Sequence, residues 1–237
     1  MNRLLFIFIS LLLASILLPQ KAVAGENVFV LRQLQDKTGD HTLCISKTGL
    51  KLVCGQMALI STAPDWNIVV FNRQTRTYFK APADQLRVPD WITKIPPGPL
   101  SEAGDDKSPR IAGLKTNHYK LSANSTGPSD LWTSRAIPLE PNTRRLLRRL
   151  YGNPNLNSVP LLITGSSLNG KSIDYLSTQW CQKRGLSDTF YRTPKSYKQV
   201  SELDMVAHPD SKSTEAISKI KPFARETKPD ETKPDKE

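Results

Sequence analysis

The sequence predicts a mainly β domain of the α+β type, in which an antiparallel sheet is accompanied by one short helix and a Pro-rich loop. Short runs rich in Val, Ile, Phe and Tyr alternate with turns of Gly, Asn, Asp and Pro, which is typical of strands that follow one another as a meander. A helical apolar stripe with ending signals on both sides is clear only near residue 146. These observations favour a single β-rich domain.

The N-terminus reads as a secretory signal peptide. A basic start is followed by an apolar run from Leu4 to Leu18 and by the small-residue site Ala-Val-Ala at 22–24. The run is shorter than the roughly 20 residues that span a bilayer as a helix, so cleavage before Gly25 is favoured over a retained anchor. Removing residues 1–24 takes away two positive charges and lowers the formal net charge from +11 to +9. A basic mature protein suits a periplasmic or secreted location with anionic surfaces nearby.

Three strands are expected first in the mature chain, at residues 27–34, 41–47 and 50–62. A Thr-Gly step at residues 48–49 supplies the bend between the second and third strands. Gly55 would mark a bulge within the third. These strands begin an antiparallel meander.

Three cysteines in an exported chain allow one disulfide and one leftover thiol. A hairpin centred on Gly49 would bring Cys44 and Cys54 opposite each other, so these two are the candidate pair. The alternative of free thiols stays open, because a cross-strand bridge also needs close Cβ atoms. Cys181 would then be unpaired and partly buried. Three cysteines do not make a spaced metal quartet, and no metal is expected.

The clearest strand signal lies between Leu59 and Pro82, LISTAPDWNIVVFNRQTRTYFKAP. It predicts two strands, 67–72 and 76–81, joined by a polar turn. In the run IVVF at 68–71, the first and third residues would lie on one face of the sheet and the second and fourth on the other. Both faces are apolar and both need cover, so we expect this pair in the middle of the sheet.

Residues 82–109 hold six prolines and little periodicity, which predicts a long surface loop. The apolar side chains within 84–96 offer enough area to dock on the sheet as a lid, whereas 97–109 is expected to lack structure. The sheet would then resume with strands at 111–123 and 131–139, separated by the turn NSTGPSD.

The clearest helix follows Pro141, with Asn142 as its N-cap and Gly152 at its C-terminal end. Its apolar stripe consists of Leu146, Leu147, Leu150 and Tyr151, and its other side carries Arg144, Arg145, Arg148 and Arg149. The arginines could bind phosphates of lipid headgroups or of nucleic acid. A solvated face that keeps the helix soluble is the preferred interpretation.

The segment Gly165–Ser172, GSSLNGKS, matches the P-loop pattern G-x-x-x-x-G-K-[ST] letter for letter. As a P-loop it would place Lys171 on the phosphates of a nucleotide and the following serine on magnesium. A P-loop leads into a helix, whereas residues 173–182, IDYLSTQWCQ, are rich in strand formers. The nucleotide-binding enzyme is therefore the least favoured of the functions considered.

The same stretch predicts a hairpin, because Asn-Gly is the strongest short hairpin turn. Pairing about Asn169-Gly170 would set Ile163 beside Leu176 and Thr164 beside Tyr175. No other catalytic motif is present: the histidines are scattered, and a thiol enzyme built on Cys181 lacks an identifiable partner histidine.

The C-terminal part begins with residues 189–206, whose Pro194 suggests a segment at the edge of the sheet. From residue 212 the chain is polar and repeats ETKPD, which predicts a disordered charged tail over 212–237. The domain organisation is thus a signal peptide at 1–24, one domain at 25–211 and the tail.

The order of these elements resembles a known superfamily over about residues 27–206. The resemblance rests on APDWNIVVFNRQTRTYFKAP, on IAGLKTNHYKLS followed by LWTSRAIPL, on the short helix, on PLLITGSSLNG and on TFYRTPKSYKQV. The chain is similar to uncharacterised exported bacterial proteins related to the LolA, LolB and RseB lipoprotein carriers. This resemblance implies a strongly curved antiparallel sheet, an open half-barrel, whose concave apolar face holds acyl chains beneath helix and loop segments. It implies no catalytic residues.

The leading hypothesis is a non-enzymatic exported protein that binds a lipid-like or other hydrophobic ligand on the concave face. The residues expected to line that face are Trp66, Phe71, Tyr78, Trp91, Leu147 and Tyr151. The alternative is a basic cell-envelope interaction module with a filled core and no ligand cavity, in which the four helix arginines contact anionic surfaces. No cofactor and no nucleic-acid partner is expected.

Overall fold

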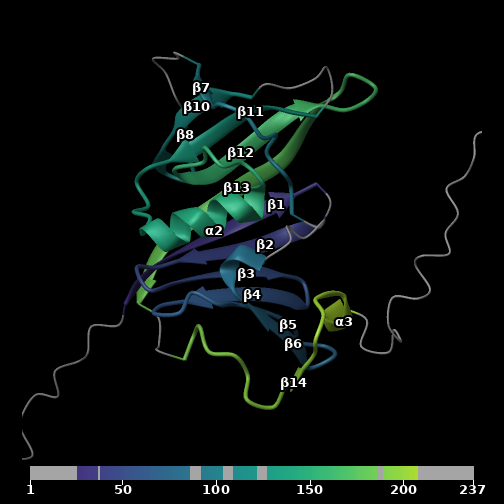
Figure 1. Cartoon of the computed structure of the whole chain (residues 1–237). Helices are drawn as coiled ribbons and strands as arrows, with labels where there is room; N and C mark the ends of the chain where they lie inside the picture. The colour runs from purple at the N-terminus through teal and green to yellow at the C-terminus, as the bar shows by residue number, and fades with distance from the viewer. Residues whose placement is uncertain are drawn as a thin grey trace, which may run out of the picture.

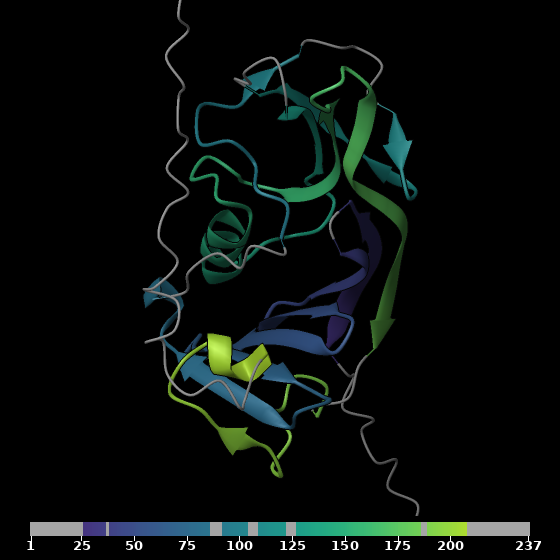
Figure 2. The same cartoon turned by 90° about the vertical axis from the view of Figure 1, so that its right-hand side faces the viewer.

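A computed structural model describes residues 26–36, 38–85, 92–103, 109–121, 127–185 and 189–207. The expected signal peptide and the expected tail lie outside these residues. The described chain is mainly β: a twelve-stranded sheet curves without closing into a barrel and holds one helix of eleven residues on its concave side (Figures 1 and 2). The predicted fold class is confirmed.

Two meanders build this sheet. The first consists of β1 (Asn27–Gln35), β2 (Gly39–Ile45), β3 (Gly49–Cys54), β4 (Met57–Thr62), β5 (Ile68–Asn72) and β6 (Thr77–Ala81). The second consists of β7 (Ser101–Glu102), β10 (Asn117–Lys120), β11 (Gly127–Ser134), β12 (Val159–Ser166) and β13 (Ser172–Gly185). The fourteen-residue β13 pairs with both β12 and β1 and so joins the two halves.

The strand order is β14-β6-β5-β4-β3-β2-β1-β13-β12-β11-β10-β7. The β5–β6 pair was expected in the middle, but it lies near one end of the sheet. The centre is instead the β1–β13 pair, which connects the first strand of the chain to one of the last. The remaining ribbon, β8 (Arg110–Ile111) with β9 (Leu114–Lys115), forms a separate two-stranded sheet.

The first meander corrects two expectations. The strand expected over 50–62 is two strands, because Gly55 (φ 52°) takes a left-handed conformation in the turn between β3 and β4 and is not a bulge. Across β2 and β3, Cys44 pairs with Lys51 and Cys54 pairs with His41, so the two cysteines are not opposite each other. All three cysteines are free in the structure, so the pairing of Cys44 with Cys54 is not seen and the alternative of free thiols is the one that the structure has.

The alternation expected for residues 68–71 is confirmed. Ile68 and Val70 belong to the large buried cluster on the concave side, whereas Val69 and Phe71 belong to a second cluster on the opposite face. The two faces therefore have separate cores, as the apolar character of both predicted.

The second meander is more broken than expected. The strand expected over 111–123 is divided into β8, β9 and β10, and β11 already begins at Gly127, within the expected turn. The hairpin expected at GSSLNGKS is confirmed: β12 and β13 flank it, Gly170 has a φ of 74°, and Ile163 pairs with Leu176. An irregularity after Ile163 shifts the next pair, so Thr164 faces Asp174 and not Tyr175.

Helix α2 (Pro141–Tyr151) fills part of the concavity (Figure 2). Its stripe residues Leu146, Leu147, Leu150 and Tyr151 are all buried in the main cluster. Gly152 ends the helix in a left-handed conformation (φ 74°), as expected. The N-cap is Glu140 and not Asn142, its side chain makes no capping hydrogen bond, and Pro141 occupies the first turn, where its missing N–H costs no helical hydrogen bond.

The described part of the Pro-rich loop docks beside this helix. Ile92 and Ile95 are buried in the same cluster, the Ile95 amide donates to the Tyr151 carbonyl at 2.7 Å, and the Thr93 amide donates to Gln35 Oε1 at 3.0 Å. The single-turn helix η1 (Ala83–Gln85) precedes this docked part. The docking expected for 84–96 is thus seen at residues 92–96, where the loop fills part of the concavity beside α2.

The C-terminal segment wraps around one end of the sheet. Phe190, Tyr191 and Tyr197 pack against the convex-side clusters. This segment then forms β14 (Lys198–Gln199), which runs parallel to β6 as the edge strand, and the one-turn helix α3 (Asp204–Ala207). Val206 of α3 is fully buried in the concave cluster. The edge position expected for this segment is confirmed. The sequence did not predict that the segment packs on both the convex and the concave face of the sheet.

Candidate functional site

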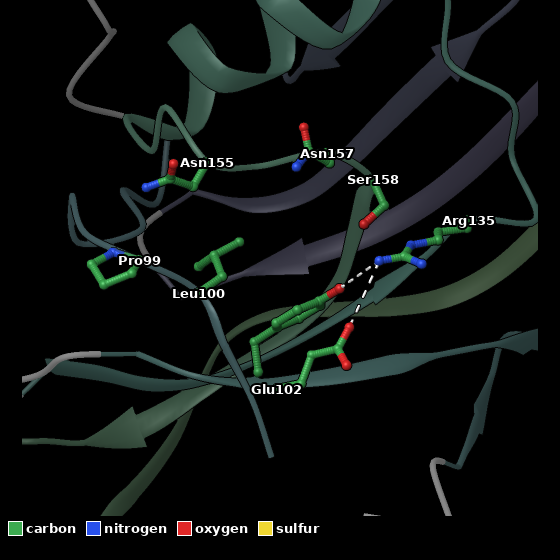
Figure 3. Close-up of a pocket in the computed structure, with 8 residues that line it drawn as sticks. Pro99, Leu100, Glu102, Arg135, Asn155, Asn157 and Ser158 are labelled. Carbon is green, nitrogen blue, oxygen red and sulfur yellow. Dashed lines mark hydrogen bonds and ion pairs between the residues drawn. The ribbon is translucent and has the colours of Figure 1, made fainter. Parts of the chain in front are cut away.

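A pocket of about 430 Å³ lies on the concave side of the second meander (Figure 3). Its walls come from the segment before β7, from β7 and β10, from the turn after β11, and from the loop between α2 and β12. We call it the Arg135 pocket; it is lined by Pro99, Leu100, Glu102, Tyr119, Arg135, Asn155, Asn157 and Ser158.

The charged groups of the pocket face one another. Arg135 Nη2 lies 3.7 Å from Glu102 Oε1 and donates a hydrogen bond to the Tyr119 hydroxyl at 3.3 Å. The Arg135 and Glu102 side chains are 66% and 64% exposed, so both reach into the space of the pocket. Figure 3 shows the guanidinium and the carboxylate directed toward each other, with Leu100 and Pro99 on the other side. The buried Ser158 hydroxyl donates to Thr133 Oγ1 at 2.6 Å.

The turn that carries Arg135 is held by its neighbour. Ser134 Oγ donates to the Lys115 carbonyl at 2.8 Å and accepts a hydrogen bond from the Ala136 amide at 3.2 Å. This bridge fixes the chain just where β11 ends. Because Tyr119 is only 8% exposed and belongs to the main cluster, its hydroxyl gives the guanidinium a second fixed contact.

The opposite wall is also well fixed. Asn153 Nδ2 donates to the Pro96 carbonyl at 2.7 Å, and Asn155 Nδ2 donates to the Gly98 carbonyl at 2.7 Å. Asn157 Oδ1 accepts a hydrogen bond from Arg148 of α2. The pocket is therefore framed by hydrogen bonds between segments that are far apart in the sequence.

The residues expected to bind a ligand do not come together. Leu147 and Tyr151 are buried in the concave cluster, whereas Phe71 and Tyr78 pair with each other and belong to the convex-side cluster. Trp66 lines a different pocket of about 320 Å³ beside the start of α2. The sixth residue, Trp91, lies outside the described residues.

Three of the four helix arginines are used within the fold. Arg144 donates to the Leu139 carbonyl at 3.3 Å, Arg148 Nε to the Leu156 carbonyl at 2.9 Å, and Arg149 Nη1 to the Asp84 carbonyl at 2.6 Å. Arg145 is exposed and lines the Trp66 pocket. Arg145 is the exposed member of the four, and the other three are partly buried. The contact with anionic surfaces stays a prediction.

A polar cluster on the convex side of the second meander has a structural explanation. His118 Nε2 lies 2.8 Å from Asp130 Oδ1, and the His118 ring stacks on Trp132 at a centroid distance of 4.3 Å. Partial burial acts to raise the pKa of Asp130, but hydrogen bonds from Lys120, Ser129 and His118 lower it overall. His118 and Trp132 are a cross-strand pair of β10 and β11, as are Lys120 and Asp130, so the cluster ties these two strands together.

Metal and membrane signals are absent from the described part of the chain. No group of three or more His, Cys, Asp or Glu side chains gathers there as a metal site. No helix among the described residues is long and apolar enough to cross a membrane.

Arg135 was not singled out from the sequence, where it is one of many basic residues. Its signal was weak but present: in LWTSRAIPL a charged residue interrupts an apolar stretch directly after a Ser that can fix a turn. Arg135 becomes a site residue because it lies beside Glu102, 33 positions earlier in the sequence. This contact depends on the order of strands β7, β10 and β11 in the sheet.

Comparison with known proteins finds similar solved structures at low identity. An uncharacterized conserved protein from Thermus thermophilus is 11% identical over 75% of this chain and 91% of its own, with a TM-score of 0.35. MucB alone is 12% identical (TM-score 0.36), and MucB in complex with MucA(peri) is 11% identical (TM-score 0.34). This chain spans 60% and 57% of those two MucB chains.

No protein-family model and no curated protein matches the chain. The likeness to MucB is distant. What the fold and the pocket define is an open, curved antiparallel sheet with a polar pocket on its concave side. The finer resemblance to lipoprotein carriers stays a prediction.

Proposed function

We propose that this chain is a non-catalytic exported binding protein whose ligand site is the Arg135 pocket. The observation that carries the proposal is the pocket itself. Its volume of about 430 Å³ lies in the usual range of small-ligand sites. Its walls combine two opposite charges, amides and hydroxyls with a small apolar side, and hydrogen bonds between distant segments hold those walls in place.

The apolar surface beneath α2 is a poorer candidate for a ligand site. The stripe of α2 is buried there, and the helix is tied down by the bond from the Ile95 amide to the Tyr151 carbonyl and by the Arg148 and Arg149 side chains. An acyl chain would have to displace the helix and expose several buried leucines, each worth about 1.5–3 kcal/mol of burial. The geometry therefore favours a filled core with a pocket beside it over a lipid cavity.

Non-denaturing mass spectrometry of the natively purified protein tests this proposal. We compare wild type, Arg135→Ala and, as a matched control, Arg145→Ala, since Arg145 is an exposed arginine outside the pocket. We expect an adduct much lighter than a lipid in wild type and in the control, and its loss in Arg135→Ala.

A lipid in solvent extracts, together with uptake of a fluorescent fatty acid that survives Arg135→Ala, would instead support the lipid-carrier hypothesis. A protein that carries no adduct and takes up no fatty acid would count against both binding functions.

A further inference from the structure

We infer that the Arg135 pocket binds the zwitterionic head of a free α-amino acid, with its carboxylate on Arg135 and its ammonium on Glu102. This inference rests on the proposed function and adds the chemical class of the ligand. It is carried by the pairing of one cation with one anion at the centre of the pocket.

The first argument is charge balance. Among the described residues that line the pocket, Arg135 and Glu102 are the ionised side chains, and their formal charges cancel. Their separation of 3.7 Å is longer than a good charge-assisted hydrogen bond, and both side chains are about two-thirds exposed. Such an exposed pair contributes little to stability, so a ligand can replace its contacts at small cost.

The second argument concerns unused hydrogen-bonding capacity. A guanidinium carries five N–H donors in a fork that matches a carboxylate, and the described contacts of Arg135 are those to the Tyr119 hydroxyl and to Glu102. A carboxylate of Glu accepts several bonds and donates none. A ligand that buried Glu102 without offering it a cation would leave a desolvated charge unpaired, which is costly.

The third argument is spacing. In an α-amino acid the ammonium and the carboxylate are attached to the same carbon, so they can meet two protein groups that are themselves adjacent. The ends of an extended peptide lie farther apart, at up to about 3.3–3.6 Å for each residue. A simple carboxylate offers Glu102 no donor, and both carboxylates and phosphate carry negative charge that Glu102 repels. The amino-acid head fits both charged groups.

The remaining walls indicate which kind of amino-acid side chain the pocket would accept. Leu100 and Pro99 form the apolar side of the pocket opposite the charges (Figure 3). The side-chain amides of Asn155 and Asn157 lie along the rim. An aliphatic side chain of moderate size would pack on Leu100, and we therefore use L-leucine as the probe.

The experiment compares L-leucine with two molecules that each lack one charge, by calorimetry on the mature protein at low salt. These are 4-methylpentanoate, which lacks the ammonium, and 3-methylbutylamine, which lacks the carboxylate; inorganic phosphate is the anion control. We expect L-leucine to bind at least about tenfold more tightly than any of the three, because a hydrogen-bonded ion pair contributes on the order of tenfold or more in affinity.

Variants then assign the two roles. Arg135→Ala and Glu102→Gln should each weaken L-leucine binding by about tenfold or more, whereas Arg145→Ala should not change it. Glu102→Gln has opposite consequences for the two ligand classes: it weakens a zwitterion and strengthens 4-methylpentanoate. Thermal unfolding of each variant shows whether the fold is retained, which we expect since both side chains are exposed.

The outcomes separate the inference from the proposed function. If 4-methylpentanoate or phosphate binds with dependence on Arg135, and L-leucine does not, the pocket is a binding site and the amino-acid inference is wrong. If none of the four probes binds and no small adduct is found on the native protein, both are wrong. If L-leucine binds equally to wild type and Arg135→Ala, its site lies elsewhere and the inference fails.

Discussion

At Gly165 the strands β11 and β12 come so close that no side chain fits between them. A Cβ atom built on this residue would lie 2.0 Å from the Gly127 carbonyl oxygen and 2.9 Å from the Pro128 Cα, both of which are backbone atoms. Gly165 is also the first glycine of the GSSLNGKS match. Its requirement for glycine comes from strand packing, so this letter of the pattern has a structural cause.

We therefore expect Gly165→Ala to destabilise the protein by about 1–3 kcal/mol, the usual cost of an overpacked side chain. Gly185→Ala is the matched control, because a Cβ there meets nothing within 4 Å, and it should change stability by less than about 0.5 kcal/mol. Urea denaturation of both variants measures the difference. Equal stabilities would contradict the close approach of the two strands.

His41 gives the fold a dependence on pH. The side chain is buried, and burial lowers the pKa from its ordinary value of 6.5 to about 4, while the nearby Asp40 acts in the opposite direction. Between these two values the unfolded chain binds a proton that the folded chain does not. The free energy of unfolding should therefore fall as the pH falls from 6.5 to about 4.

The measurement is the slope of stability against pH for wild type and for His41→Gln, which cannot titrate. We expect the wild type to lose more stability than the variant over that window, whatever the difference between them at pH 7. Parallel curves would show that His41 is protonated to the same extent in both states.

At the scale of elements, the local sequence pattern predicted whether a segment is a strand or a helix. It predicted less well which strand a segment pairs with and in which register. The alternation at 68–71 and the stripe of α2 follow from neighbouring residues, and both are confirmed. The register that separates Cys44 from Cys54 and the shift after Ile163 depend on turn and bulge geometry, which spacing alone does not determine. The Arg135 pocket needs four segments at once and was missed.

The wrapping of the C-terminal segment gives an element-scale prediction. Val206 is fully buried in the concave cluster, and its carbonyl accepts hydrogen bonds from Thr75 Oγ1 and Thr77 Oγ1 at 3.2 Å each. Val206→Ala should cost about 2 kcal/mol of stability through lost burial and a cavity. Lys195→Ala, an exposed position on the same segment, should be neutral. The measurement is the melting temperature of each variant. If the two variants have the same melting temperature, α3 does not contribute to the core.

At the scale of the whole molecule, the β1–β13 pair is the joint on which both meanders depend. Each of these strands has a hydrogen-bonded neighbour on either side, and the cluster around α2 draws residues from both halves of the sheet. Separating β1 from β13 would therefore open the shared core, which requires unfolding of the whole domain. At the ends of the sheet, β14 or β7 can be released while that core stays intact.

Hydrogen exchange in the native state measures this difference, since amides exchange through the cheapest opening that exposes them. We expect the slowest amides in β1 and in the part of β13 that pairs with it, with an opening free energy equal to that of global unfolding. Amides of β14 and β7 should exchange fastest among the strands, and those of β5 and β6 at an intermediate rate. If the slowest amides were instead in β5 and β6, the most stable part of the fold would be the strand pair that the sequence alone had favoured. The two halves of the sheet could then separate without global unfolding.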